Sequence, residues 1–287
     1  MMKRIVLLGI FAGLLVGGAI AQTLQLPSSI TAGTDVSIPT SGSGDATLYV
    51  FGPKTTIKRK IQLGQPIQIE ADQLKAAGRY LVLVKGGEEA AGSFIVTPAK
   101  LENLAFLARP SRVPASKKGA VTGSAYLFDA YNNLVLTPSP VKFELSIDGG
   151  SPVARTETSK NGIAWVRVDS GKTAGAAQFV ASVPNASVKR VVQQTASDPC
   201  NIRMHAQSDK DGGILVETDP IKDCSGNPVP DGTIVTFTST DQSGRSTVDA
   251  RIKRGIAKAE LPPSQSALLS VAAGVVLGNE IKWGGGR

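Results

Sequence analysis

The sequence predicts an all-β fold in which β-sandwiches follow one another along the chain. Short segments with alternating apolar and polar residues recur throughout, and this period of two is typical of strands with one face in a core. The clearest runs from Val141 to Ile147. Further strand candidates are residues 48–51, 80–84 and 94–96, whereas a helical turn is expected only within residues 72–77. Clusters of Gly, Pro, Asn and Asp separate these segments at intervals of about 8–12 residues, the spacing of sandwiches and barrels.

The N-terminus has the parts of a secretory signal peptide. A positive head precedes an apolar run at residues 5–20, which ends at the small-residue cleavage site Ala19-Ile20-Ala21. We therefore expect a signal peptide at residues 1–21, a mature chain that begins at Gln22, and an extracytoplasmic location in the periplasm, at the cell surface or outside the cell. The alternative is an uncleaved anchor, but the run is short for a membrane span, which needs about 20 apolar residues. No later segment is long and apolar enough to span a bilayer.

An internal repeat covers the last two thirds of the mature chain. Asp129–Phe143 aligns without gaps with Asp223–Phe237, at an offset of 94 residues. Further along, residues 162–164 align with 255–257 at an offset of 93, and Val180-Ala181 aligns with Val271-Ala272 at an offset of 91. Order is kept and the offset changes only by loop-sized steps, so this region is two copies of one fold. The identical pairs in the first segment are Asp129 and Asp223, Asn133 and Asn227, Val135 and Val229, Val141 and Val235, and Phe143 and Phe237.

The repeat and the preceding region together predict three sandwich domains, at residues 22–98, 99–196 and 197–287. In the first domain, Tyr80 enters a strand directly after a glycine turn. Such a tyrosine is similar to the tyrosine corner of immunoglobulin-type sandwiches, in which the hydroxyl caps backbone groups where the chain crosses between the sheets. An ordinary strand tyrosine is the alternative.

One segment of the repeat carries a family resemblance. The sequence Asp-x-x-Gly-Asn-Pro-Val-Pro-Asp-Gly followed by Val-x-Phe, at Asp223–Phe237, resembles bacterial immunoglobulin-like domains of the invasin and intimin repeat type. The middle domain departs from the pattern, with Tyr131-Asn132 in place of Ser-Gly and Leu134 in place of Pro. The resemblance covers about residues 99–283 and implies tandem immunoglobulin-like β-sandwiches. It implies little about function, because such domains serve as spacers and as binding tips.

The two cysteines, Cys200 and Cys224, are expected to form a disulfide, because an even pair in an exported chain usually does. Strand order places both at the end of the third domain that lies near the second. The alternative is a pair of buried free thiols.

Catalysis has few candidate residues. His205 is the only histidine, it lies in an apparent strand, and no G-x-S-x-G motif accompanies it. Asp209 and Asp211 lack the rest of a calcium loop, and the turns at Asp129 and Asp223 suit side-chain bonds to backbone N–H groups without a metal. We therefore expect no catalytic residue, no cofactor and no metal site.

The charge favours anionic partners. The formal net charge is +8, and loss of Lys3 and Arg4 with the signal peptide leaves +6. Either solvated strand edges or a surface that binds anions explains the basic residues. We expect a protein, an anionic glycan or a cell-envelope surface as partner, and no nucleic acid. The basic clusters are Lys54, Lys58, Arg59 and Lys60; Arg109, Arg112, Lys117 and Lys118; and Arg245, Arg251, Lys253 and Arg254.

A possible contact surface lies at Ile163, Trp165 and Arg167. The repeat pairs Trp165 with Lys258, in a strand whose charged residues must face solvent. Because side chains alternate along a strand, Ile163, Trp165 and Arg167 should point outward as well. The alternatives are a neighbouring domain or loop that covers Trp165, or a bulge that turns it into the core.

These observations together predict an exported, non-catalytic, structural or adhesive binding protein. One alternative is a periplasmic accessory or assembly scaffold that binds partner proteins. The other is a hydrolase that uses scattered carboxylates, although no pair of carboxylates stands out.

Overall fold

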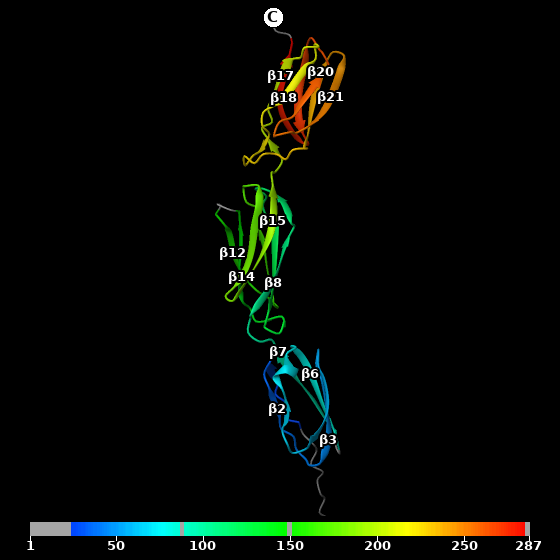
Figure 1. Cartoon of the computed structure of the whole chain (residues 1–287), viewed down its shortest axis with the longest axis vertical. Helices are drawn as coiled ribbons and strands as arrows, with labels where there is room; N and C mark the ends of the chain where they lie inside the picture. The colour runs from blue at the N-terminus through cyan, green and yellow to red at the C-terminus, as the bar shows by residue number, and fades with distance from the viewer. Residues whose placement is uncertain (1–23, 87–88, 148–150, 285–287) are drawn as a thin grey trace, which may run out of the picture. The chain divides into compact units, whose positions relative to one another are not determined.

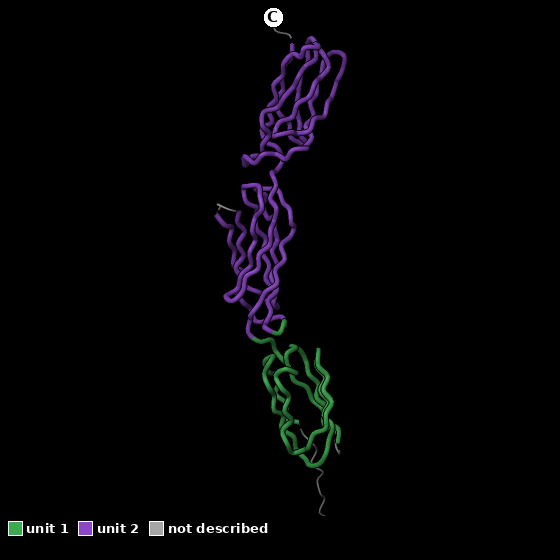
Figure 2. Tube along the Cα trace, in the orientation of Figure 1, with its two compact units in different colours: residues 1–99, 131–133 green, residues 100–130, 134–287 purple. Residues whose placement is uncertain are grey.

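The computed structural model describes residues 24–86, 89–147 and 151–284. The predicted signal peptide lies outside this part of the chain. The described residues form strands joined by turns, and their only helix is the 3-10 turn η1 (Ala71–Leu74). No helix among them has the length and hydropathy to cross a membrane. The chain divides into two compact units: residues 1–99 with 131–133, and residues 100–130 with 134–287 (Figure 2).

Unit 1 contains one sandwich, called the first sandwich here. A five-stranded sheet in the order β1-β7-β6-β3-β4 lies over the two-stranded sheet β2-β5, with the core between them. β1 and β7 are parallel, and the other pairs are antiparallel. The strands are β1 (Ser29–Thr31), β2 (Val36–Ile38), β3 (Asp45–Phe51), β4 (Thr56–Gln62), β5 (Ile67–Ile69), β6 (Gly78–Lys85) and β7 (Ala90–Thr97).

The tyrosine corner of the first sandwich is confirmed. Tyr80 is fully buried in β6 and stacks on Phe94 of β7, with ring centroids 5.4 Å apart. Its hydroxyl donates a hydrogen bond of 3.0 Å to the backbone carbonyl of Ala76. The side chain therefore ties the connection that precedes β6 to the core.

Unit 2 contains two sandwiches, and the first of them is the middle sandwich (Figure 1). Its sheets have the orders β13-β10-β8 and β12-β11-β14-β15-β9, and β9 pairs with β15 in parallel. The strands are β8 (Asn103–Arg109), β9 (Arg112–Pro114), β10 (Val121–Phe128), β11 (Pro140–Ser146), β12 (Val153–Thr158), β13 (Ile163–Val168), β14 (Gly175–Val183) and β15 (Ala186–Thr195).

The third sandwich completes unit 2. Its main sheets are β17-β18-β22 and β21-β20-β23-β24, and the short pair β16-β19 lies at the end where the chain enters. The strands are β16 (Pro199–Cys200), β17 (Met204–Ser208), β18 (Ile214–Thr218), β19 (Lys222–Asp223), β20 (Ile234–Asp241), β21 (Gly244–Arg251), β22 (Lys258–Leu261), β23 (Ala267–Ala273) and β24 (Val276–Trp283).

Each sandwich has its own hydrophobic core. The alternating segment in β11 buries Val141 and Phe143 completely, and the repeat places Val235 and Phe237 of β20 in the same positions, also completely buried. The predicted core residues are therefore confirmed. The predicted boundaries at residues 98 and 196 stay predictions.

One step of the sequence alignment is wrong. The offset of 91 paired Val180 with Val271. In the sheets, however, Phe143 lies opposite Ala181 and Phe237 lies opposite Val271, so Ala181 is the equivalent of Val271 at an offset of 90. Both are buried, whereas Val180 is half-buried. An alignment shifted by one residue would exchange the inward and outward faces of β14. The pairing of Phe143 with Ala181 and of Phe237 with Val271 excludes that shift.

Candidate functional site

Trp165 points outward from the middle sandwich, as predicted. It is 64% exposed, whereas its neighbours Ala164 and Val166 are buried. The pairing of β13 with β10 is regular from Val121 to Tyr126, so no bulge changes the phase of the strand. Within the described residues of unit 2, neither a loop nor the third sandwich covers the indole.

The outer face of the sheet β13-β10-β8 extends this apolar spot across three strands. Trp165 lies opposite Ser124 of β10, and Ser124 lies opposite Leu107 of β8, which is 44% exposed. In the adjacent row, Tyr126 lies opposite Ile163, which is half-buried. Trp165, Leu107, Tyr126 and Ile163 thus share one face, which we call the tryptophan face.

Two arginines flank the tryptophan face. Thr122 of β10 lies opposite Arg167 on one side and Arg109 on the other, which forms a third row beside that of Trp165. Both arginines are exposed. The ion pairs found among the described residues involve neither of them. The face therefore combines exposed aromatic and aliphatic groups with two cations at one edge.

Sequence reasoning had selected Ile163, Trp165 and Arg167 and missed Leu107 and Tyr126. The reason lies in β8, where residues 104–108 form an apolar run that hides which residues face inward. Phe106 is buried, and Leu107 is outside. Tyr126 could have been found, because it is the apolar residue out of phase with Ala125 and Leu127 in β10.

The disulfide between Cys200 and Cys224 is confirmed, with a Cα–Cα distance of 5.0 Å. It joins the start of the third sandwich to the turn after β19. The same turn is held by Asp223, whose Oδ1 accepts the N–H groups of Ser225 (2.8 Å) and Asn227 (2.9 Å). Its Oδ2 accepts the N–H of Ser197 at 2.9 Å. Both oxygens of this carboxylate therefore accept backbone N–H groups, which is the side-chain bonding to backbone that was predicted for this turn.

His205 is a surface residue of β17, and its Nε2 lies 2.8 Å from Oδ1 of Asp219. It lines a depression of about 330 Å³ together with Thr218, whose hydroxyl oxygen accepts the N–H of Ala257. That hydroxyl has a structural role. Within the described ranges, no group of three or more His, Cys, Asp or Glu side chains could hold a metal ion.

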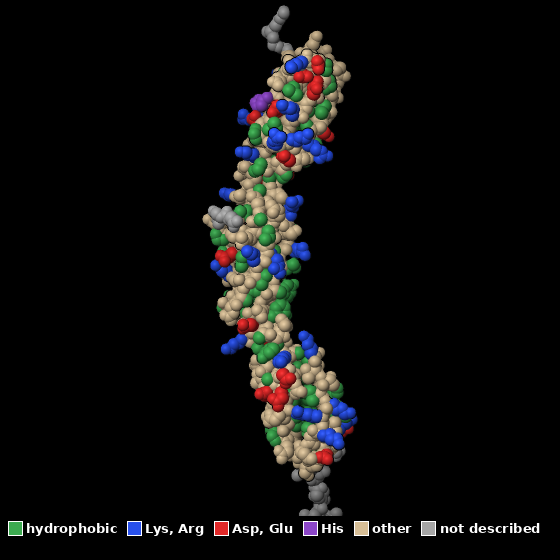
Figure 3. Space-filling view, in the orientation of Figure 1, with side chains coloured by type: hydrophobic (Ala, Val, Ile, Leu, Met, Phe, Trp, Pro, Cys, Tyr) green, Lys and Arg blue, Asp and Glu red, His purple; other side chains and the backbone are tan. Residues whose placement is uncertain are grey.

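The basic clusters lie partly on edge strands and partly in connections. Lys54, Lys117, Lys118, Lys253 and Arg254 lie between strands. Lys58, Arg59 and Lys60 lie on β4, and Arg245 and Arg251 lie on β21, which are both edge strands. In the middle sandwich, Arg109 and Arg112 lie on the edge strands β8 and β9. Figure 3 shows Lys and Arg side chains gathered on parts of the first and third sandwiches. Charge on edge strands opposes pairing with other chains, which accounts for the basic residues on these strands.

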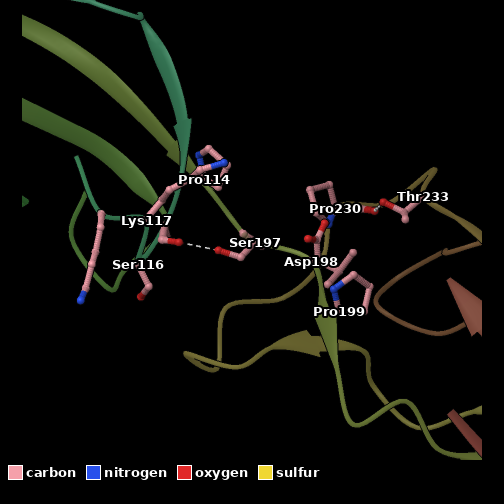
Figure 4. A pocket seen from close by; sticks show the side chains of 12 residues that line it. Pro114, Ser116, Lys117, Ser197, Asp198, Pro199, Pro230 and Thr233 are labelled. Carbon is pink, nitrogen blue, oxygen red and sulfur yellow. Dashed lines mark hydrogen bonds between the residues drawn. The ribbon is translucent and has the colours of Figure 1, made fainter. Parts of the chain in front are cut away.

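A cleft of about 490 Å³ lies between the middle and third sandwiches (Figure 4). Pro114 and Lys117 line one side, and Pro199 and Pro230 line the other. Between two of its lining residues, the hydroxyl of Ser197 donates a hydrogen bond to the carbonyl of Ala115. The cleft is shaped by the junction between the two sandwiches, and its polar groups are partly used by that junction.

No protein-family model and no curated protein matches the chain. Among solved structures, FdeC, an adhesin of Escherichia coli, matches with a TM-score of 0.59 and 17% identity, over 92% of this chain and 96% of that chain. InvD of Yersinia pseudotuberculosis matches with a TM-score of 0.50 and 14% identity, over 92% and 97%. Invasin, a bacterial integrin-binding protein, gives a TM-score of 0.49 and 13% identity, over 92% and 60%. Such identities bear on the fold. The chain therefore consists of tandem immunoglobulin-like β-sandwiches of the kind found in FdeC and InvD, as the resemblance to the invasin and intimin repeats implied.

Proposed function

We propose that the protein is an exported, non-catalytic binding protein of the adhesive kind, and that the tryptophan face of the middle sandwich is its contact surface. The observation that carries the proposal is the exposure of Trp165 at 64%, beside Leu107 and Tyr126 on one sheet face. A large aromatic side chain that stays in water forgoes the free energy it would gain from burial. Contiguous apolar groups that remain exposed are typical of binding surfaces.

The charges on this face favour an acidic saccharide as the ligand. An indole ring offers a flat apolar surface to the C–H groups of a sugar ring. Arg109 and Arg167 lie one row away, and a guanidinium binds a carboxylate through two parallel hydrogen bonds. No acidic residue lies in the three rows that form the face.

Two observations support the extracytoplasmic and adhesive parts of the proposal. The disulfide between Cys200 and Cys224 suits an oxidising compartment. FdeC, whose fold is similar, is an adhesin. Protease treatment of intact cells tests the location: we expect the chain to be degraded at the cell surface, whereas protection until the envelope is opened would favour the periplasmic accessory role.

Binding to hyaluronan, an acidic polysaccharide, tests the tryptophan face, with neutral dextran as the comparison. We expect Trp165→Ala and Arg167→Gln each to weaken retention on hyaluronan at least about tenfold, which is the loss of one good contact. Leu136→Ala is the matched control, because Leu136 is a similarly exposed apolar residue of the same sandwich outside this face. Equal binding by the wild type and Trp165→Ala would remove Trp165 from the site. Binding to neither polysaccharide would reject the acidic saccharide.

A further inference from the structure

The side-chain amide of Asn227, in the third sandwich, contacts the backbone of the middle sandwich. Nδ2 donates to the carbonyl of Lys172 at 2.8 Å, and Oδ1 accepts the N–H of Ala174 at 2.8 Å. Asn227 is only 7% exposed. One amide thus satisfies a backbone carbonyl and a backbone N–H that lie two residues apart in the loop.

Asn227 is held in place by its own turn. Its Nδ2 also donates to Oδ2 of Asp223 at 2.8 Å, so both amide hydrogens are used. Nδ2 lies between two acceptors and Oδ1 faces a donor, so the orientation of the amide is defined. The side chain is therefore positioned by the third sandwich before it meets the loop of the middle sandwich.

The same pair of bonds occurs in unit 1. Residues 131–133 belong to this unit (Figure 2), and Tyr131 packs against its core. There Asn133 donates from Nδ2 to the carbonyl of Lys75 at 2.7 Å and accepts the N–H of Ala77 at 2.8 Å. Asn133 and Asn227 are equivalent in the repeat. The residues that precede them, Asn132 and Gly226, both have a left-handed backbone, with φ of 63° and 87°.

The receiving loops also share a sequence. Lys75-Ala-Ala-Gly78 and Lys172-Thr-Ala-Gly175 occupy the same place, because each ends in the glycine that begins the strand, β6 or β14. Gly78 and Gly175 have φ of 143° and 148°, a region that side chains with a Cβ rarely adopt. We call this Lys-x-Ala-Gly sequence the receiving loop and the Asp-x-x-x-Asn turn the inserting turn.

The third sandwich has no receiving loop at the corresponding place. The structural offset falls from 93 at β22 to 90 at β23, so the connection is three residues shorter and contains Pro262-Pro263. Gln265 stands where the middle sandwich has Gly175. The carbonyl of Ser264 instead accepts the indole N–H of Trp283 at 3.1 Å. Residues 22–98, which form the first sandwich, contain no asparagine.

We propose that the receiving loop of the middle sandwich is an interaction surface for one partner, the third sandwich, which it binds through the inserting turn. The two backbone groups of the loop suit an amide side chain, since the planar amide of Asn or Gln offers a donor and an acceptor side by side at any pH. The turn orients that amide, and Ser116 with Ser225 adds a contact between hydroxyl oxygens at 2.6 Å. The receiving loop and the inserting turn together set the orientation of the third sandwich on the middle sandwich.

Hydrogen exchange of single amides in the full chain tests the proposal. Asn227→Ala should accelerate exchange of the Ala174 N–H at least about tenfold, because its acceptor is gone. The Ala77 N–H should keep its rate, since it depends on Asn133. Asn133→Ala should give the reverse pattern, so each variant is the control of the other. Asn185→Ala, at an exposed hairpin residue, should change neither rate. Unchanged protection of Ala174 in Asn227→Ala would overturn the proposal.

A second variant separates docking from folding. Ala174→Pro removes the N–H from the receiving loop and changes no residue of the third sandwich. Residual dipolar couplings then report whether the middle and third sandwiches still align as one body. Two different alignment tensors would support the proposal, and a common tensor would overturn it. If Asn227→Ala also speeds exchange of the Phe237 amide, the third core itself is destabilised. In that case Ala174→Pro is the variant that decides.

Discussion

At the scale of single residues, Asp223 links the stability of the third sandwich to pH. Burial raises the pKa of this carboxyl, but the hydrogen bonds from the Asn227 amide and from the N–H groups of Ser197, Asn227 and Ser225 outweigh it and hold the pKa below its ordinary value of 3.8. A lowered pKa in the folded state stabilises the fold above pH 3.8, and this contribution is lost as the pH falls through the folded pKa.

We expect the free energy of unfolding of Asp223→Asn to differ from that of the wild type, by an amount that depends on pH. At neutral pH the variant should have the lower free energy of unfolding, because an amide cannot accept all four bonds. The difference should shrink as the pH falls below 3.8, since the wild-type carboxyl then binds a proton more readily in the unfolded chain than in the folded one. Denaturant titrations across this range measure both curves. A difference that does not depend on pH would show that the charge of Asp223 contributes nothing.

Tyr80→Phe removes only the hydroxyl of the tyrosine corner. We expect the first sandwich to lose about 1 kcal/mol, the typical worth of one hydrogen bond, because the carbonyl of Ala76 loses its donor. Thermal unfolding followed through the amide signals of β6 measures the change. Tyr49→Phe is the control, because Tyr49 is not fully buried and stacks on Phe51 at the surface. An equal loss in both variants would argue against a special role for the corner.

Several residues of the site were predictable because charge and alternation act together. Lys258 cannot face a core, and its repeat partner Trp165 follows the same phase, so the exposure of the indole could be predicted without a structure. The partners of Asn133 and Asn227 were not predicted. The two asparagines were visible in the repeat, and the two Lys-x-Ala-Gly segments were visible at an offset of 97. Nothing in a linear sequence says that side-chain amides meet backbone groups of another segment.

At the scale of the structural element, the disulfide closes the entrance of the third sandwich. The two cysteines are 24 residues apart in sequence. In the chain-entropy model, opening a loop of this length should cost about 3 kcal/mol. Reduction, or a double Cys200→Ser and Cys224→Ser variant, should therefore lower the unfolding midpoint of this sandwich. Thiol titration of the unfolded, unreduced protein should find no free thiol, and two reactive thiols would contradict the bond.

Strands β14 and β23 show where alignment at the level of elements fails. Both contain small apolar residues on both faces. Val180-Ala181 therefore matched Val271-Ala272 in sequence, although this match is one residue out of register. Register is decided by which residues lie opposite Phe143 and Phe237, and that depends on pairing between strands distant in sequence. The element type was predictable from alternation, whereas the exact register needed the sheet.

At the scale of the whole molecule, the three separate cores predict separate responses to mutation. Truncation of Phe237 to Ala should destabilise the third sandwich by about 3–5 kcal/mol, because contacts are lost and a cavity remains. Phe143→Ala should do the same in the middle sandwich. Amide signals of unit 1, whose core contains neither residue, should melt at the wild-type temperature in both variants. A single shared transition for all three cores would contradict this independence.

The parallel pairing of β1 with β7 and of β9 with β15 matters when the ends of the chain are pulled apart. In each pair, one strand lies near the start of its sandwich and the other ends it. Tension then slides the two strands past each other, and all the hydrogen bonds of a pair bear the load together. The third sandwich has no such pair among its described strands. Instead, the Asn279 side chain accepts the N–H of Met204 at 2.7 Å and donates to its carbonyl at 3.1 Å. Under such tension we expect the third sandwich to yield first, while the first and middle sandwiches keep their folds.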